Sequence, residues 1–214
     1  MCQLSKWKMV FGLTGFLYLA APAMAQTVER PEMHVGDRWS WQHTNAMTNE
    51  EDWTKIEDVV SVDNKEIRTR IRKKGTSNNL IATYTTDMNP IDTGNERYQP
   101  DLTRFVFPFQ PGKKWSGEFD KMLFINGKHG KFFVKAEVTG PEKITVQAGE
   151  FDAYKIKLVY DATATDESAM EGKTVETFWY APEVKNYVKL ESSFTHDRQV
   201  RSQDVFELLD YSLR

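Results

Sequence analysis

The sequence is almost without cysteine: Cys2 is the single one in 214 residues. Cys2 lies in a segment that we expect to be removed, so the mature chain is predicted to carry no thiol, no disulfide and no cysteine metal site. An exported protein without disulfides is more typical of a Gram-negative periplasm than of a eukaryotic extracellular space, where small domains are usually cross-linked. The sequence also has no Asn-x-Ser/Thr glycosylation site, which agrees with that compartment.

Long apolar runs are also missing. The longest, residues 9–21, is shorter than the roughly 20 apolar residues that span a bilayer. Lys6 and Lys8 precede it, and a small-x-small site follows at residues 23–25. This order predicts a cleaved signal peptide over residues 1–25 rather than a membrane anchor, and no transmembrane span in the mature chain. Because no cysteine stands at the cleavage point, a lipid anchor is not expected.

Recognisable catalytic motifs are absent as well. The four histidines, at positions 34, 43, 129 and 196, are scattered and form no H-E-x-x-H pattern, and there is no G-x-S-x-G turn. Acidic residues are abundant, but only their separation in space can define a catalytic pair. The sequence therefore predicts no catalytic residue, no metal site and no cofactor.

A basic excess is lacking too. The formal net charge is −3, and it becomes more negative once Lys6 and Lys8 are removed, which argues against nucleic-acid binding. One local exception is a row of Arg68, Arg70 and Arg72 on one face of a predicted strand, about 7 Å apart. This row is a candidate anion-binding site for a phosphorylated lipid headgroup or an acidic partner. The alternative is a solvated outer face that protects a sheet edge from aggregation.

Alternating hydrophobicity dominates what is present, most clearly in residues 143–160. They are predicted to form a strand, a tight turn at Ala148-Gly149 and a longer strand. Phe151 is out of phase with the later apolar row, which predicts a bulge or a late turn beside Glu150. The apolar face after the turn consists of Tyr154, Ile156, Leu158 and Tyr160.

The same pattern recurs along the chain, and no amphipathic helix is evident outside the signal segment. About a dozen short strands separated by turns predict an all-β antiparallel sandwich, or a partly open barrel of curved sheets, in a single domain over residues 26–214. One strand is expected over residues 102–109, and residues 200–213 favour a strand over a short helix. Residues 163–172 are predicted to form an acidic loop.

Two short segments are similar to each other. Residues 36–40 and 112–116 each contain a glycine, two charged residues and Trp-Ser, and a long hairpin and an aromatic strand follow both. This predicts a pseudo-repeat of residues 34–100 and 110–214, two related meanders that complete one core. Chance similarity at the start of two strands is the alternative.

Aromatic residues make up 13% of the chain, and five of them are candidates for binding a sugar or lipid ligand. The alternative is that they form the core, because aromatic side chains dominate burial in β-proteins. Large side chains on curved sheets often line a cavity, which keeps both interpretations open. The five candidates are Trp39, Trp41, Trp115, Trp179 and Tyr180.

Three phrases carry a family resemblance: P-G-K-K-W at residues 111–115, V-Q-A-G-E-F-D-A-Y-K-I at 146–156, and W-Y-A-P-E-V at 179–184. With them, the second half of the mature chain resembles a group of uncharacterised exported bacterial β-proteins. The resemblance implies a fold and a compartment. It implies no catalytic residue, because the group has no assigned activity.

Together these patterns predict a non-catalytic periplasmic protein that binds an apolar or amphipathic ligand, such as a lipid, or an envelope protein partner. One alternative is a hydrolase of an envelope polymer built from Asp, Glu and His residues that are distant in sequence. Another is a structural interaction module. An apolar cavity would favour binding, converging carboxylates or histidines would favour catalysis, and the lack of a pocket would favour the structural module.

Overall fold

The computed structural model describes residues 27–163 and 171–214. The predicted signal peptide over residues 1–25 lies outside the described residues, and so does most of the loop expected over residues 163–172. Within the described ranges the chain forms twelve strands and one short 3-10 turn, which agrees with the predicted number of strands. The elements are β1 (Arg38–Asn45), β2 (Glu50–Val62), β3 (Glu66–Lys73), β4 (Asn79–Thr85), β5 (Pro90–Asp92), β6 (Glu96–Gln99), β7 (Lys114–Leu123), β8 (His129–Val146), β9 (Gly149–Thr163), β10 (Lys173–Ala181), η1 (Pro182–Val184), β11 (Asn186–His196) and β12 (Gln199–Ser212).

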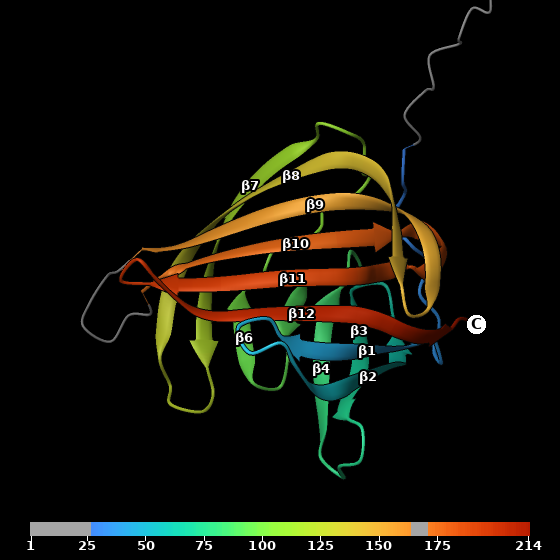
Figure 1. Ribbon diagram of the computed structural model, residues 1–214, viewed down its shortest axis with the longest axis horizontal. Coiled ribbons are helices and arrows are strands. Elements are labelled where there is room, and N and C mark those ends of the chain that lie inside the picture. Colours follow the sequence, from blue (N-terminus) through green and yellow to red (C-terminus); the bar gives the residue numbers. More distant parts are fainter. Residues whose placement is uncertain (1–26, 164–170) are drawn as a thin grey trace, which may run out of the picture.

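The strands form a closed antiparallel barrel (Figure 1). Each strand pairs with its neighbours in sequence, and β1 pairs with β12 from Arg38↔Ser212 to Asn45↔Asp204, which closes the ring. The predicted all-β antiparallel class and the predicted C-terminal strand are therefore confirmed. The barrel is closed, which is a finer result than the predicted sandwich or partly open barrel. Closure pairs the ladder groups that an open sheet would leave at its two edges.

Alternation along the longest hairpin explains its place in the wall. On β8, Val134, Ala136 and Val138 are buried and pair with Tyr160, Leu158 and Ile156 of β9. The residues between them on β8 are exposed or half-buried. One face of the hairpin thus supplies core side chains and the other meets solvent.

Neither the bulge nor the late turn expected beside Glu150 is there, so that prediction is wrong. Glu150 pairs regularly with Thr145, and the register shift lies between Val138 and Gly140 on the partner strand. The change of phase that the sequence shows in β9 is taken up by an extra residue, Thr139, in β8. The turn occupies Gln147-Ala148, one residue earlier than expected, and Gly149 opens β9 with a φ of 140°.

The expected strand over residues 102–109 is also absent. The segment between β6 and β7, residues 100–113, which we call the plug, instead buries Leu102, Phe105 and Phe109 in the barrel interior, whereas residues 110–112 are exposed. Phe109 of the plug makes an isolated bridge with Val28. The Asn89 side chain donates to the Phe105 carbonyl at 2.9 Å and accepts from the Phe105 amide at 2.6 Å. A side chain therefore satisfies backbone groups that a strand would pair in a ladder.

The plug fills one end of the barrel with aromatic rings. Phe105 lies 5.5 Å from Phe178 and 5.7 Å from Tyr180, measured between ring centroids. Trp39 and Trp41 are fully buried, and their indole N–H groups donate to backbone carbonyls of Val184 and Tyr187. This end carries η1, the β8–β9 hairpin and the C-terminus, whereas the β11–β12 turn lies at the other end (Figure 1). The barrel is therefore solid at one end.

The plug also divides the chain into two sets of six strands, β1–β6 and β7–β12. Both Gly-x-x-Trp-Ser segments begin a strand after a glycine with positive φ, 97° at Gly36 and 81° at Gly112. This local similarity agrees with the pseudo-repeat of residues 34–100 and 110–214, which stays a prediction. The three family phrases fall at the start of β7, in the β8–β9 hairpin and at the β10–η1 junction.

Candidate functional site: a cavity at the open end of the barrel

Two adjoining cavities occupy the end of the barrel opposite the aromatic core. The larger, of about 1100 Å³, is lined by residues of β6 to β12 and the plug. The smaller, of about 450 Å³, lies among β2, β3, β4, β11 and β12. Thr93 and Arg104 line both, so the cavities meet at these residues. Ligand pockets in proteins commonly measure about 300–1,000 Å³, so the space suits a small molecule.

Arg104 is the most unusual residue of this site. It is held on the plug next to Phe105, whose backbone is fixed by Asn89, and near Trp115, whose indole donates to the Thr103 carbonyl at 3.0 Å. Its guanidinium carbon lies 4.9 Å from the centre of the Phe178 ring. In the part of the chain that the structure describes, the guanidinium makes neither a hydrogen bond nor an ion pair, and its buried Nε has no acceptor.

The other ionisable groups deeper in the large cavity have partners. Glu96 forms an ion pair with Lys121 at 2.8 Å and accepts the Tyr98 hydroxyl. The Tyr160 hydroxyl donates to Glu176 at 2.8 Å. Burial, together with the neighbouring carboxylate in each case, raises the pKa of Tyr98 and of Tyr160, so both hydroxyls stay protonated as donors.

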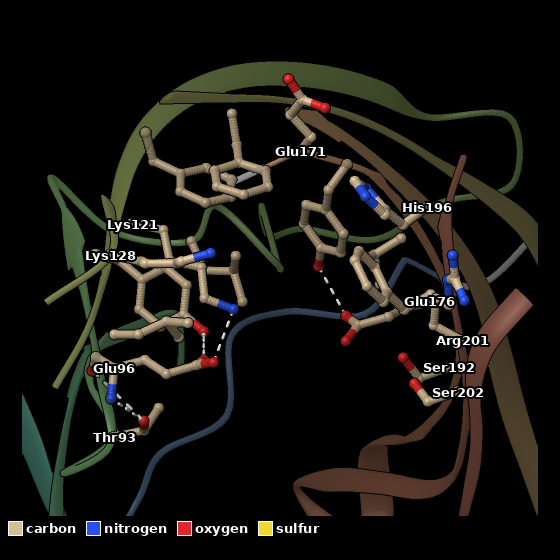
Figure 2. Close-up of a pocket in the computed structure, with 18 of the residues that line it drawn as sticks. Thr93, Glu96, Lys121, Lys128, Glu171, Glu176, Ser192, His196, Arg201 and Ser202 are labelled. Atoms are coloured by element: carbon tan, nitrogen blue, oxygen red, sulfur yellow. Dashed lines mark hydrogen bonds and ion pairs between the residues drawn. The ribbon is translucent and has the colours of Figure 1, made fainter. Parts of the chain in front are cut away.

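The two sides of the large cavity carry charges of both signs. Lys121 and Lys128 lie on one side, and Glu176, His196 and Arg201 lie on the other (Figure 2). Lys128 and Arg201 are exposed, whereas Lys121 and Glu176 are half-buried. The interior is therefore amphipathic, because Leu-, Phe- and Tyr-bearing strands supply the wall between these polar groups.

The lining of the smaller cavity combines apolar side chains with basic ones. Its four basic residues are Lys55, Arg72, Lys73 and Arg104, and no carboxylate is among the residues that line it. Lys55 and Arg72 are each paired with an acidic residue outside the lining, and the Lys73 ammonium lies over an indole ring. The apolar part of the lining consists of Trp53, Ile71, Leu80, Pro90, Leu190 and Phe206.

Lys55 belongs to a buried polar network in the barrel wall. Its ammonium lies 2.8 Å from the Glu57 carboxylate, which also accepts the Thr69 and Tyr84 hydroxyls at 2.7 Å each. Burial alone would raise the pKa of Glu57, but Lys55 and the two hydroxyl donors hold it below its ordinary value. Burial alone would lower the pKa of Lys55, but Glu57 raises it above its ordinary value. The network is thus a charged pair in the folded protein.

The aromatic residues predicted as ligand-binding lie elsewhere. Trp39 and Trp41 stack on each other, with ring centroids 6.3 Å apart, in the solid end of the barrel. Trp115 stacks on Phe109 of the plug, and Tyr180 lies edge-on to the same ring. None of these residues is among those that line the two cavities. They pack as core, and their role in binding stays a prediction.

Trp179 faces the other side of the sheet from Phe178 and Tyr180, because neighbouring strand residues point to opposite faces. It is almost fully buried, its indole donates to Glu142, and the ammonium groups of Lys155 and Lys189 lie 4.9 and 5.5 Å from its ring centre. Trp179 thus packs under charged side chains, away from the cavities.

The basic row lies on β3, whose inner face carries Ile67 and Thr69. Arg68 donates to Glu66 at 2.8 Å, and Arg72 pairs with Asp58 at 3.0 Å and reaches the rim of the smaller cavity. Arg70 is exposed and makes no ion pair within the described residues. The row is therefore partly neutralised, and anion binding by all three arginines stays a prediction.

Sequence reasoning missed Arg104, Glu176 and the cavity tyrosines. Arg104 did give a signal, because it is the one charged residue in the stretch Leu102 to Phe109, L-T-R-F-V-F-P-F. A single arginine among aromatic residues suggests a charge that faces an interior rather than solvent. Glu176 and Tyr160 belong to neighbouring strands, and only their pairing brings the two side chains together.

Two kinds of feature are absent from the described ranges. These ranges contain no group of three or more His, Cys, Asp or Glu side chains placed to hold a metal ion. Among the same residues, no helix has the length and apolar character needed to cross a membrane.

Comparison with known proteins places the fold. No protein-family model and no curated protein sequence matches the chain. A candidate exported protein with a YmcC-like fold from Bacteroides fragilis is 14% identical, with a TM-score of 0.54 over 87% of this chain and all of that one. A candidate lipoprotein from Parabacteroides distasonis gives 14%, 0.53 and the same coverage. The hypothetical lipoprotein YmcC from Escherichia coli is 9% identical, with a TM-score of 0.46 over 82% of this chain and 84% of that one. The first two comparisons show that this chain has the YmcC-like fold.

Proposed function

We propose that this chain is a non-catalytic, exported protein of the bacterial envelope that binds an amphipathic ligand inside its barrel. The observation that carries the proposal is the cavity of about 1100 Å³ at the open end of a barrel whose other end is packed solid. Closed β-barrels with one accessible interior are a common scaffold for small-molecule binding.

The lining supports an amphipathic ligand over a purely polar one. Phe119, Phe132 and Leu102 line the large cavity beside charged groups, and the smaller cavity adds a mostly apolar extension. A molecule with an apolar tail and a polar head would bury its tail against these rings and keep its head near the charges.

The partners of the acidic groups favour binding over hydrolysis. Glu96 is held by Lys121 and Tyr98, Glu176 by Tyr160, and His196 lies 3.2 Å from Asp197. A general acid or base needs its proton-transfer atom directed at substrate, and these groups are directed at their own neighbours. The volume of the cavity favours a ligand-binding protein over the structural module.

The proposed compartment is the periplasm. Residues 1–25 have the order of a signal peptide, and two proteins of the same fold are described as a candidate exported protein and a candidate lipoprotein. An amphipathic ligand suits this compartment, where lipids must cross an aqueous space between two membranes.

The test is native mass spectrometry of the protein purified from a periplasm, followed by extraction of whatever it retains. We expect an amphipathic molecule to accompany the protein and to be lost from Ser192→Trp, which fills the cavity. Ser193→Trp is the matched control, because Ser193 is the next residue on β11 and does not line either cavity. Equal retention by the two variants would place any ligand outside the barrel and refute the proposal.

A further inference from the structure

We propose that Arg104 is the anchor for an anionic group, a carboxylate or a phosphate, on the ligand. This inference rests on the proposed function and makes it specific, because it assigns the chemical class of the ligand and names the guanidinium group that binds its head. The class is an anionic amphiphile.

The Arg104 guanidinium has a buried donor without a partner. The other interior basic groups have partners: Lys55 has Glu57, Lys121 has Glu96, and Arg72 has Asp58. Arg104 has none within the described chain, although its Nε is buried and its ring contact with Phe178 leaves the N–H donors unused. The Nε–H is the donor that is buried without an acceptor, and leaving a donor unpaired away from water is costly. A bound anion would satisfy several of the N–H donors at once, because the guanidinium fork matches a carboxylate or phosphate.

Arg104 lies where the two cavities meet. A head bound there leaves the smaller cavity, with its apolar wall of Trp53, Ile71 and Phe206, within reach of a tail. That cavity has no carboxylate among its lining residues, and Lys55 is already paired with Glu57, so Arg104 is the cation that attracts a negative charge there. Charge and apolar surface are thus arranged for one molecule that carries both.

The backbone that carries Arg104 is held rigidly. Arg104 extends from the plug, whose backbone is fixed on both sides of it by Asn89 and by the Trp115 indole. A binding group held by rigid neighbours loses little conformational freedom when the ligand binds. The same bonds hold the plug in place without the ligand, so the site exists before binding.

Glu176 is the group that opposes an anion. It is the carboxylate whose charge acts most on Arg104, yet no oxygen of Glu176 lies within 4.0 Å of the guanidinium, and the Tyr160 hydroxyl donates to it. An anion at Arg104 would therefore feel repulsion from Glu176, and removal of that charge should strengthen binding.

The experiment is calorimetric titration of the delipidated protein with dodecanoate, dodecyl phosphate and monododecanoylglycerol, an uncharged amphiphile with the same chain. We expect Arg104→Met to weaken binding of the two anions roughly 10- to 100-fold, the range for a lost charged hydrogen-bond pair, and to change binding of the uncharged lipid less than about threefold. Arg104→Lys should retain part of the anion affinity, and Glu176→Gln should raise it severalfold. Arg30→Met, which removes an exposed charge from a residue that lines neither cavity, is the matched control and should change nothing.

The outcomes separate the two levels of the argument. If the parent protein binds none of the three amphiphiles, the proposed function and this inference both fail. If it binds them and Arg104→Met, shown to be folded by its circular dichroism spectrum, keeps full affinity for both anions, the inference fails and the proposed function stands. Because both anions are proposed to bind the same guanidinium, inorganic phosphate should compete with both and not with monododecanoylglycerol, and no competition against either anion would overturn the assignment of a discrete anion site. Unchanged anion affinity in Glu176→Gln would contradict the electrostatic part of the argument.

Discussion

The buried pair of Lys55 and Glu57 gives the most direct test of how charge is held in the barrel wall. In Glu57→Gln the new amide oxygen still accepts the Tyr84 and Thr69 hydroxyls, which lie 2.7 Å from the present carboxylate. What the change removes is the negative charge and the acceptor 2.8 Å from the Lys55 ammonium, because an amide N–H₂ takes the place of that oxygen. The substitution therefore isolates the cost of an unpaired cation in the barrel interior.

The expected loss is about 3 kcal/mol of the free energy of unfolding. Removing one partner of a buried ion pair typically costs about 3–5 kcal/mol, because the other charge stays buried. The Glu57 side chain is 3% exposed, but that of Lys55 is 16% exposed and lines the smaller cavity, where water can reach it. The low end of the range applies for that reason.

Urea denaturation followed by tryptophan fluorescence measures the effect. With a slope of about 2–3 kcal/mol per molar urea, 3 kcal/mol moves the midpoint by roughly 1 M. The double variant Lys55→Met with Glu57→Gln should recover most of the loss, because neither charge is then buried alone. The surface pair Lys143 and Glu150, both mostly exposed, is the control, and Glu150→Gln should leave the midpoint in place. A Glu57→Gln midpoint within 0.2 M of the parent, roughly the error of such a measurement, would refute the argument.

Two further predictions follow from the same structure. The pKa of Glu57 is lowered in the folded state, so its contribution to stability is fully present above its ordinary pKa of 4.5 and is lost as the pH falls through the folded pKa. Urea midpoints measured between pH 3 and 6 should therefore fall less steeply towards acid in Glu57→Gln than in the parent. Parallel curves would contradict the assigned direction. Phe105→Ala should cost about 3–5 kcal/mol of unfolding free energy, because the ring packs against Phe178, Tyr180 and Phe109. Phe133→Ala, on the outer side of β8, should cost less than about 1 kcal/mol in the same denaturation assay. Equal costs would show that the plug is not part of the core.

The strands could be predicted because their signal is local. Alternation along β8 and β9 depends only on which face of the same strand is buried, and it can be read within a few residues. Closure could not be predicted in the same way, because it depends on the pairing of β1 with β12, whose partners are separated by most of the chain. A sandwich and a barrel require the same inner and outer faces from each strand, so the sequence pattern leaves both possible.

The bulge shows how a local signal can lie on the wrong strand. Phe151 and Ala153 are buried, and so are Tyr154 and Ile156, so the buried face of β9 changes at Ala153-Tyr154. The sequence of β9 shows this change but does not show which strand carries the extra residue. The structure places it at Thr139, across the ladder, because a bend in either strand of a pair corrects the phase of both.

The plug was mistaken for wall because its residues alternate as those of a strand do. Phe105, Phe107 and Phe109 are two apart, which predicts one apolar face, and Phe105 and Phe109 are indeed buried. Alternation does not reveal that the N–H and C=O groups of Phe105 are hydrogen-bonded to the Asn89 side chain instead of to a neighbouring strand. Periodicity gives the direction of side chains, and hydrogen-bond partners decide whether a segment forms the barrel wall or enters the interior.

The same segment connects the two ends of the barrel. Phe105 packs into the aromatic core, and the preceding residue, Arg104, faces the cavities, because neighbouring residues of an extended chain point in opposite directions. The burial of Phe105 is therefore what keeps the Arg104 guanidinium in an interior from which it would otherwise move to solvent. Core stability and recognition of a charge are therefore coupled in this segment. Burial of the Phe105 ring on folding gains free energy, and this gain offsets the cost of leaving the Arg104 cation unpaired while no ligand is bound. It follows that ligands which pair with Arg104 should stabilise the protein against unfolding, and that Arg104→Met should be no less stable than the parent when the cavity is empty.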